Sequence, residues 1–142
     1  MTEENKKENI IKELDRAMEA MDAANLLFNN GFLNDAVSRL YYYILHHVRA
    51  LLLTKGLEPK THEGVLRVFS LYFIKEGLFE PKASHTFAKL MKYREEADYN
   101  PAYMFTKEDF IEFRKEAEDL ASMINGYLKE KGYFLKGLHK SH

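Results

Sequence analysis

Residues 34–55 read NDAVSRLYYYILHHVRALLLTK, and the helical periodicity of this stretch decides the fold. At about 100° per residue, its large apolar side chains fall on one side of a helix. They are Val37, Leu40, Tyr41, Ile44, Val48, Leu51 and Leu52. Asn34 or Asp35 stands where an N-cap is expected, and Gly56 stands where a helix should stop. The stretch therefore predicts a helix with a wide buried face.

The opposite side of this helix lacks the Lys, Glu and Gln that an ordinary exposed face carries. It is expected to consist of Arg39, Tyr42, Tyr43, His46, Ala50 and Leu53. Amphipathic aromatic side chains and Arg are typical of protein interfaces. We therefore predict a homodimer in which this helix pairs with its copy, so that two Arg39 and two His46 meet across a two-fold axis.

Four further segments have the same helical periodicity on either side of this helix. We expect them at residues 5–29, 61–77, 81–100 and 106–129. Thr61 and Thr106 are suitable N-caps, and Pro81 is suited to a first helical turn. Short connectors favour an all-α, five-helix antiparallel up-and-down bundle, formed by one domain at residues 1–129. Residues 130–142 contain two Gly and a basic end, and we expect a frayed tail there.

The amino-acid composition limits the classes of protein to which the chain can belong. The 142 residues are 46% hydrophobic with seven Gly and three Pro, which argues against a disordered or an all-β chain. A formal charge of −1 gives no global attraction to nucleic acid, so contact with RNA would have to be local. With no Cys, no secretory signal pattern and no long apolar stretch, a cytoplasmic protein without membrane contact is expected.

Arg39 and His46 together are candidate catalytic residues. Their spacing of seven residues places them about 20° apart around the helix and ~10 Å apart along it. Histidine can transfer protons near neutral pH, and an Arg can stabilise a phosphate, which are the minimum parts for metal-independent cleavage of RNA. The same two side chains could equally stack and hydrogen-bond inside a dimer seam. No metal-binding or nucleotide-cofactor motif is present, so neither a metal nor a cofactor is expected.

Three pieces of the sequence resemble one family when taken in order. They are residues 35–46 (DAVSRLYYYILH), residues 60–65 (KTHEGV) and residues 94–99 (REEADY). This combination is similar to that of HEPN-domain proteins, in particular the small prokaryotic UPF0332-like members. The resemblance extends over about Ile10 to Tyr127.

The resemblance implies a five-helix domain that commonly dimerises and is often paired with a small nucleotidyltransferase as a toxin–antitoxin or defence module. Several members are metal-independent ribonucleases with an R-x(4–6)-H motif. Arg39 and His46, with six residues between them, match that motif at its long limit. Nuclease-competent members usually have a polar residue directly after the Arg, whereas this chain has Leu40, which the periodicity turns toward the core.

Five further residues are candidates for a supporting role. His47 is expected between the two helix faces as a hydrogen-bonding residue at their edge, and His62 in the first turn of the third helix. Arg94 and Asp98 are spaced as an i, i+4 ion pair. Tyr99 is expected to pack the fourth helix against the second.

The sequence thus leaves two main functional hypotheses open, and a purely structural helical adaptor is a third alternative. The first is an RNA-directed protein of a toxin–antitoxin or defence module, acting as a metal-independent ribonuclease through Arg39 and His46. The second is a non-catalytic helical dimer that binds a nucleotidyltransferase antitoxin or a nucleotide. In the second case Tyr42 and Tyr43 would be interface anchors that Arg39 and His46 merely orient.

Overall fold

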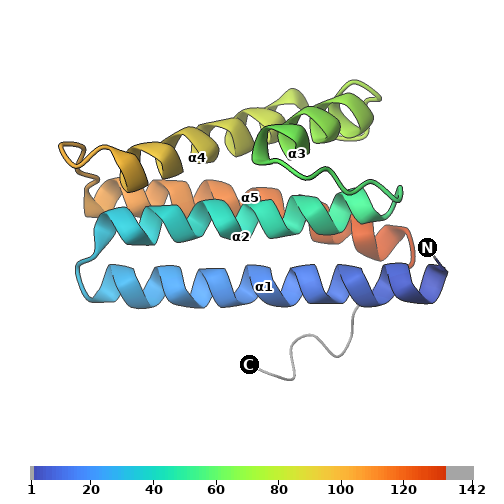
Figure 1. The fold of residues 1–142 in the computed structure, drawn as a ribbon, viewed down its shortest axis with the longest axis horizontal. Coiled ribbons are helices and arrows are strands. Elements are labelled where there is room, and N and C mark those ends of the chain that lie inside the picture. The colour runs from blue at the N-terminus through green and yellow to red at the C-terminus, as the bar shows by residue number, and fades with distance from the viewer. Residues whose placement is uncertain (1, 134–142) are drawn as a thin grey trace.

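The computed structural model describes residues 2–133, and five α-helices occupy most of that range (Figure 1). They are α1 (Glu3–Asn29), α2 (Leu33–Leu53), α3 (His62–Phe69), α4 (Pro81–Tyr99) and α5 (Lys107–Glu130), with one π-helical turn, η1 (Ser70–Ile74), directly after α3. No β-strand occurs among the described residues, so the expected all-α, five-helix fold is confirmed. None of the described helices is both long and apolar enough to cross a membrane.

Helix α2 is the centre of the bundle. It runs antiparallel to α1, and α4, α5 and α3 also pack against it (Figure 1). Thirteen of its 21 residues are buried, which explains why residues 34–55 have so wide an apolar face. Large side chains from the other helices complete the core around it, among them Ile10, Phe69, Phe87, Phe110 and Leu120. Any functional group on α2 is therefore held by a helix that is packed on most of its sides.

Several of the expected helix ends are confirmed by their hydrogen bonds. The hydroxyl of Thr61 accepts from the backbone N–H of Gly64 at 2.9 Å. Thr106 and Asp109 form a reciprocal capping box, with bonds of 2.9 and 3.0 Å between the side chain of each and the backbone N–H of the other. Gly56 has a φ of 71°, the left-handed conformation that ends α2 at little cost for Gly.

The expected N-cap of α2 is wrong. The helix begins at Leu33, so Asn34 and Asp35 lie in its first turn, and Phe32 precedes it without a side-chain cap. The amide of Asn34 instead binds the α4–α5 connector, where it donates to the carbonyl of Tyr103 at 2.7 Å and accepts from the N–H of Phe105 at 3.1 Å. A short polar side chain can either cap its own helix or bind the backbone of a distant segment, and the packing around it decides which of the two it does.

The start of the expected tail is ordered by contacts. Glu130 is the last residue of α5, and the hydroxyl of Tyr133 donates to Glu3 at 3.2 Å while its backbone N–H donates to Leu128. Fraying is therefore wrong for residues 130–133, because a partly buried Tyr ties them to the start of α1. The rest of the expected tail, residues 134–142, lies outside the described residues.

Candidate functional site

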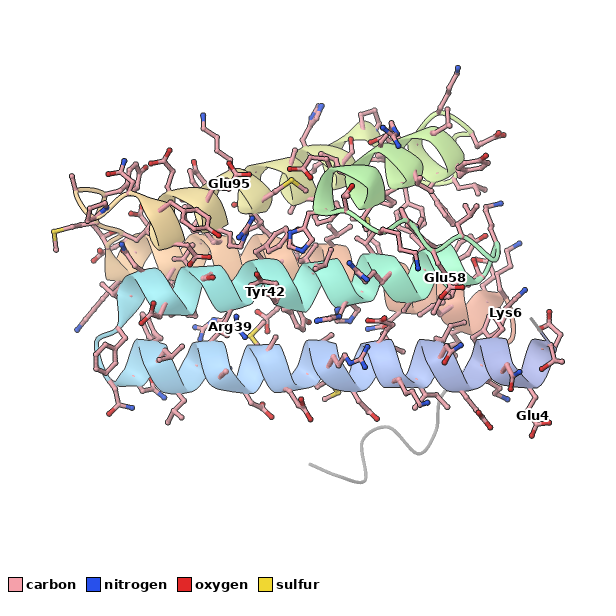
Figure 2. All side chains as sticks on the ribbon, in the orientation of Figure 1. Glu4, Lys6, Arg39, Tyr42, Glu58 and Glu95 are labelled. Atoms are coloured by element: carbon pink, nitrogen blue, oxygen red, sulfur yellow. The ribbon has the colours of Figure 1, made fainter. Side chains whose placement is uncertain are left out.

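The outward side of α2 carries five side chains at alternating three- and four-residue steps. They are Asp35, Arg39, Tyr42, His46 and Arg49, and we refer to them as the outer stripe of α2. Asp35 is exposed and the other four are partly buried. Figure 2 shows Arg39 and Tyr42 on the same side of the helix. The structure thus brings Arg39, Tyr42 and His46 onto one face, as the helical spacing predicts.

Three residues expected on this face lie elsewhere. Ala50 and Leu53 are 0% and 4% exposed, so they belong to the core of the single chain. Tyr43 lies on the α5 side of the helix, where burial and the charge of Glu118 raise its pKa to about 12. Compared with the predicted face, the outer stripe in the structure is rotated around the helix axis by about 30° toward Arg49. The reason is that α1 packs along α2 and covers part of the face that was predicted to be exposed.

His47 is buried and does not reach the surface. It is 3% exposed, its Nδ1 lies 2.9 Å from the carbonyl oxygen of Tyr43, and the two rings stack edge to face. Burial lowers the pKa of His47 to about 4, with the nearby His46 as a smaller cause in the same direction. Its role is to hydrogen-bond, as expected, but inside the core. Leu40 is also fully buried, which confirms that it points inward.

A carboxylate on α1 holds His46. Nδ1 of His46 lies 2.8 Å from Oε1 of Glu13, and the other carboxylate oxygen of Glu13 lies 3.5 Å from Nη1 of Arg16. The side chains of His46 and Glu13 are 21% and 14% exposed, so the contact is shielded from solvent without being sealed. A carboxylate can only accept here, which assigns the proton between them to Nδ1, so that in the neutral ring Nε2 is the acceptor.

Glu13 is a site residue that the sequence does not point out. It lies at the edge of the apolar stripe of α1 that contains Ile10, Leu14 and Ala17. From the sequence alone, a Glu at that place is interpreted as an ordinary surface residue, and only the packing of α1 against α2 shows otherwise. The one signal in the sequence that could have pointed to Glu13 is the short connector between α1 and α2, which forces the two helices to be antiparallel neighbours.

Arg39 is held by an aromatic ring. Its guanidinium carbon lies 4.6 Å from the centroid of the Tyr42 ring, within the range of a cation–π contact. Within residues 2–133 the Arg39 side chain has no carboxylate partner, so its five donors are not committed to an internal ion pair. The outer stripe therefore places an oriented His and an uncommitted Arg on one rigid helix.

A second polar group lies beside the stripe, where α3 and α4 meet α2. The His62 ring is 5.5 Å from the Tyr41 ring, and the guanidinium carbon of Arg94 is 5.3 Å from the same ring. Nη1 of Arg94 lies 3.5 Å from Oδ2 of Asp98, so the expected i, i+4 pair is present but long. His62 and Arg94 thus come together although 32 residues separate them in the sequence.

Tyr99 does not pack α4 against α2. It is 75% exposed, and its contact is with Arg94 of its own helix, whose guanidinium carbon lies 5.9 Å from the ring. The expected packing role is therefore wrong. Tyr99 is the last residue of α4, just before Asn100 and Pro101, and its ring is exposed there rather than packed against α2.

A family model described as HEPN domain matches residues 12–127. The chain belongs to the HEPN family. It is 40% identical over 124 residues to a "Putative toxin" of Methanocaldococcus jannaschii, covering 87% of this chain and 92% of the relative. It is 34% identical over 127 residues to a "UPF0332 protein" of Thermotoga maritima, covering 89% and 96%. A second "Putative toxin" of M. jannaschii is 36% identical over 103 residues, covering 72% and 70%.

The HEPN domain also has a cavity of about 380 Å³ between α1, the end of α2 and residues 57–60. Four basic side chains line it, Lys12, Arg16, Arg49 and Lys60, against two acidic ones, Glu13 and Glu58. A neutral protein thus carries a locally basic hollow next to the Glu13–His46 pair. Within residues 2–133 no three His, Asp or Glu side chains are placed to share a metal ion.

The buried hydroxyl of Tyr41 in this HEPN domain gives a first prediction. The residue is 0% exposed and its hydroxyl has no hydrogen-bond partner within residues 2–133, and burial raises its pKa well above the usual range. Tyr41→Phe removes this unpaired group and keeps the ring, so we expect the free energy of unfolding to rise by about 1 kcal/mol. Urea denaturation in phosphate-free buffer measures it.

A matched control for this variant is Tyr72→Phe, at an exposed position on η1. Its free energy of unfolding should stay within about 0.5 kcal/mol of the parent protein. A clear loss of stability in Tyr41→Phe alone would contradict the account, because it would mean that the hydroxyl has a partner in solution.

Proposed function

We propose that this HEPN protein is a toxin that cleaves RNA without a metal ion, with Arg39 and His46 as its catalytic residues. The observation that carries the proposal is the 2.8 Å contact between Glu13 and Nδ1 of His46. It fixes the ring of His46 and leaves Nε2 as the nitrogen that can accept a proton. The names of the two archaeal relatives, each a "Putative toxin", support the same reading.

In the proposed reaction the 2′-hydroxyl of the RNA is the nucleophile. Nε2 of His46 takes its proton, O2′ attacks the adjacent phosphorus, and the P–O5′ bond breaks. The leaving 5′-oxygen takes up a proton from solvent, and the protonated His46 returns its proton to solvent, so protons balance over the turnover. One fragment is left with a 2′,3′-cyclic phosphate and the other with a 5′-hydroxyl. Arg39 would stabilise the negative charge that builds on the phosphate oxygens, a role suited to a permanently charged guanidinium.

We further propose that the active form is a dimer through the outer stripe of α2. Arg39 and Tyr42 are amphipathic side chains on a partly exposed face, a composition that favours an interface. A two-fold axis there would set two Arg39–His46 pairs in one groove. Sedimentation velocity tests this directly: a dimer that Tyr42→Glu converts to a folded monomer is expected, whereas a parent protein that is already monomeric would contradict it.

A toxin needs a partner that restrains it. We propose a nucleotidyltransferase antitoxin: the relatives' name, "Putative toxin", supports an antitoxin partner, and the family resemblance supports a nucleotidyltransferase in that role. The test is to co-express the chain with a nucleotidyltransferase encoded next to it. Co-purification of the two proteins in a fixed ratio is expected, and clean separation at moderate salt would contradict the proposal.

The experiment for the enzymatic function uses purified full-length protein, single-stranded RNAs of varied sequence and an excess of EDTA. We expect cleavage that EDTA does not inhibit, and none when the same sequences carry 2′-O-methyl groups, because the nucleophile is then blocked. RNA that stays intact with purified dimer would overturn the enzymatic proposal. The non-catalytic alternative, a module that binds its partner or a nucleotide, would then stand in its place.

Glu13→Gln gives the next prediction. The amide keeps the shape of the side chain, and its oxygen can still accept from Nδ1, but a neutral acceptor makes a weaker hydrogen bond than a carboxylate, so the ring of His46 is held less firmly. We expect kcat for RNA cleavage to fall by about ten- to a hundredfold, a part of what a positioned general base supplies. KM should change by less than about threefold, since Glu13 would touch no substrate.

The matched control is Glu19→Gln, at an exposed position of the same helix. It removes the same charge from α1 without touching His46, so both kinetic constants should stay as they are. Equal losses of kcat in the two variants would show that the net charge of α1, and not the contact with His46, is what matters.

A further inference from the structure

The cavity of about 380 Å³ between α1, the last turns of α2 and residues 57–60 is next to the proposed catalytic His, and we refer to it as the α1–α2 cavity. Its volume is within the range of ~300–1,000 Å³ that is usual for sites of small organic groups. Glu13 lines the cavity, and Oε1 of the same side chain lies 2.8 Å from Nδ1 of His46. A group bound in the α1–α2 cavity would therefore lie beside the reacting part of an RNA strand.

The inner wall of the α1–α2 cavity is apolar. Leu52 and Leu53 are 0% and 4% exposed, and the partly buried Leu57 and Pro59 line the cavity as well. The segment that carries Leu57 and Pro59 is tied to α2, because the backbone N–H of Leu57 donates to the carbonyl oxygen of Leu52 at 3.1 Å. A flat base that leaves the stack of a strand can pack against apolar side chains of this kind.

Most of the polar side chains that line the α1–α2 cavity are free to bind a ligand. Four of them make no hydrogen bond or ion pair within residues 2–133, namely Asn9, Lys12, Glu58 and Lys60. Glu58 and Lys60 are two residues apart on one short segment, and Figure 2 shows Glu58 at the opposite end of α2 from Arg39. A carboxylate and an ammonium group are thus available together at the mouth of an apolar cavity.

Among the four RNA bases, guanine is the one that suits a carboxylate beside an ammonium group. Guanine has two adjacent N–H donors, on N1 and on N2, which one carboxylate can accept together, and its O6 and N7 are acceptors for an ammonium group. Adenine and cytosine have a ring nitrogen lone pair beside the amino group, and uracil has a carbonyl oxygen on each side of its N–H. Each of these three would place a lone pair against the carboxylate.

We propose that the α1–α2 cavity binds the guanine base of a nucleotide next to the scissile phosphate, with Glu58 accepting from N1–H and N2–H and Lys60 donating to O6. The inference rests on the proposed ribonuclease function and names its substrate, which is single-stranded RNA cut beside guanosine. A base in a single strand has its Watson–Crick edge free for such contacts. Glu58 and Lys60 are specificity-determining residues here, and the proton transfer stays with His46.

The first experiment measures binding without turnover. Full-length protein is titrated against fluorescent 2′-O-methyl hexanucleotides, which have no free 2′-hydroxyl, made of uridine with one variable central base. Ionic strength is held constant, because attraction to the phosphate backbone depends on salt. We expect the strand with guanine to bind about tenfold or more tightly than those with adenine, cytosine or uracil, the size of a lost charge-assisted contact. Equal Kd values for the four strands, or tightest binding of another base, would overturn the proposal.

A second experiment identifies Glu58 as the acceptor. Inosine lacks the N2 amino group of guanosine, so exchanging guanosine for inosine should raise Kd about tenfold with the parent protein. With Glu58→Gln the two strands should bind within about threefold of each other, because the carboxylate that accepts from N2–H is gone. Glu76→Gln removes the same charge at an exposed position outside the cavity and should keep the parent ratio. A tenfold ratio that persists in Glu58→Gln would overturn the assignment.

The role of Lys60 is tested in the same way. Lys60→Gln should weaken the guanosine strand about tenfold and the all-uridine strand less than about threefold, since only a base held in the cavity reaches this side chain. Lys75→Gln, at an exposed position outside the cavity, should leave both strands within about twofold. Equal weakening of both strands in Lys60→Gln would mean general attraction to phosphate and would overturn its assignment. Circular dichroism checks each fold, and if one variant unfolds, the other and the comparison of strands in the parent protein still decide.

Failure of this inference is distinguishable from failure of the proposed function. Guanine-selective binding by a protein that leaves all RNA intact would overturn the ribonuclease proposal alone. RNA cleavage in EDTA without preference for guanosine at the cut would overturn the guanine site alone.

Discussion

His46→Ala is expected to lower the rate of metal-independent RNA cleavage by about 10²- to 10⁴-fold, the range that a positioned general base or acid contributes. His46 is 21% exposed, and its one hydrogen bond within residues 2–133 is that with Glu13. Removal of the ring takes away the proton acceptor and leaves the Glu13 carboxylate still close to Arg16 at 3.5 Å. The rate is measured with a fluorescent single-stranded RNA in EDTA.

The control for this variant is His85→Ala, at an exposed position on α4. It should cleave RNA at the parent rate, and both variants should keep the parent helical content and oligomeric state. A His46→Ala protein that is folded, dimeric and as active as the parent would remove His46 from the mechanism. Loss of activity together with loss of the dimer would instead point to His46 as an interface residue.

The second large effect concerns His47 and acid. Burial holds the pKa of His47 at about 4 in the folded chain, against 6.5 for an unperturbed His. Between these values the unfolded chain binds a proton at His47 and the folded chain does not, so stability rises with pH over this window. The contribution is fully present above pH 6.5 and is lost as pH falls to about 4. The loss should amount to about 3 kcal/mol in the free energy of unfolding.

The measurement compares urea unfolding of the parent protein with that of His47→Gln at pH 7, 5.5 and 4. Gln cannot be protonated, and it can still donate toward the carbonyl of Tyr43. The variant should be less stable at pH 7 because it packs less well. Its disadvantage should then shrink by about 3 kcal/mol on acidification. If the two proteins lose stability in parallel, His47 is not buried in its neutral form.

Most of the fold could be predicted from local signals. The helix ends at Thr61, Pro81, Thr106 and Gly56 depend on a few neighbouring residues, so hydrogen bonding and backbone preference within one turn identify them. The α2 cap is the exception. Asn34 has a distant partner in the α4–α5 connector, and no local pattern reveals a contact across 71 residues.

The site could be predicted only in part. Helical spacing sufficed to group Arg39, Tyr42 and His46, because they share one helix. It could not show which part of that face α1 covers, so Ala50 and Leu53 were placed at the surface although both are buried. Contacts between side chains of different helices could not be predicted for the same reason. The contact of Glu13 with His46, and the meeting of His62 and Arg94 at the Tyr41 ring, emerge only when the packing is known.

The outer stripe of α2 therefore carries the parts for a reaction, namely the pair of Arg39 and His46 with Glu13 of α1 behind it. These side chains are fixed on helices whose inner faces form the core. Substitutions at the stripe should accordingly change function more than stability, whereas changes at buried residues such as Leu40 should do the reverse.

The most direct test of the central claim is the chemistry of the RNA ends produced in EDTA, determined by mass spectrometry of the fragments. Catalysis by His46 with the 2′-hydroxyl as nucleophile predicts a 2′,3′-cyclic phosphate on one fragment and a 5′-hydroxyl on the other. Fragments that carry a 3′-hydroxyl and a 5′-phosphate would contradict the claim, because water and not the 2′-hydroxyl would then have attacked the phosphorus.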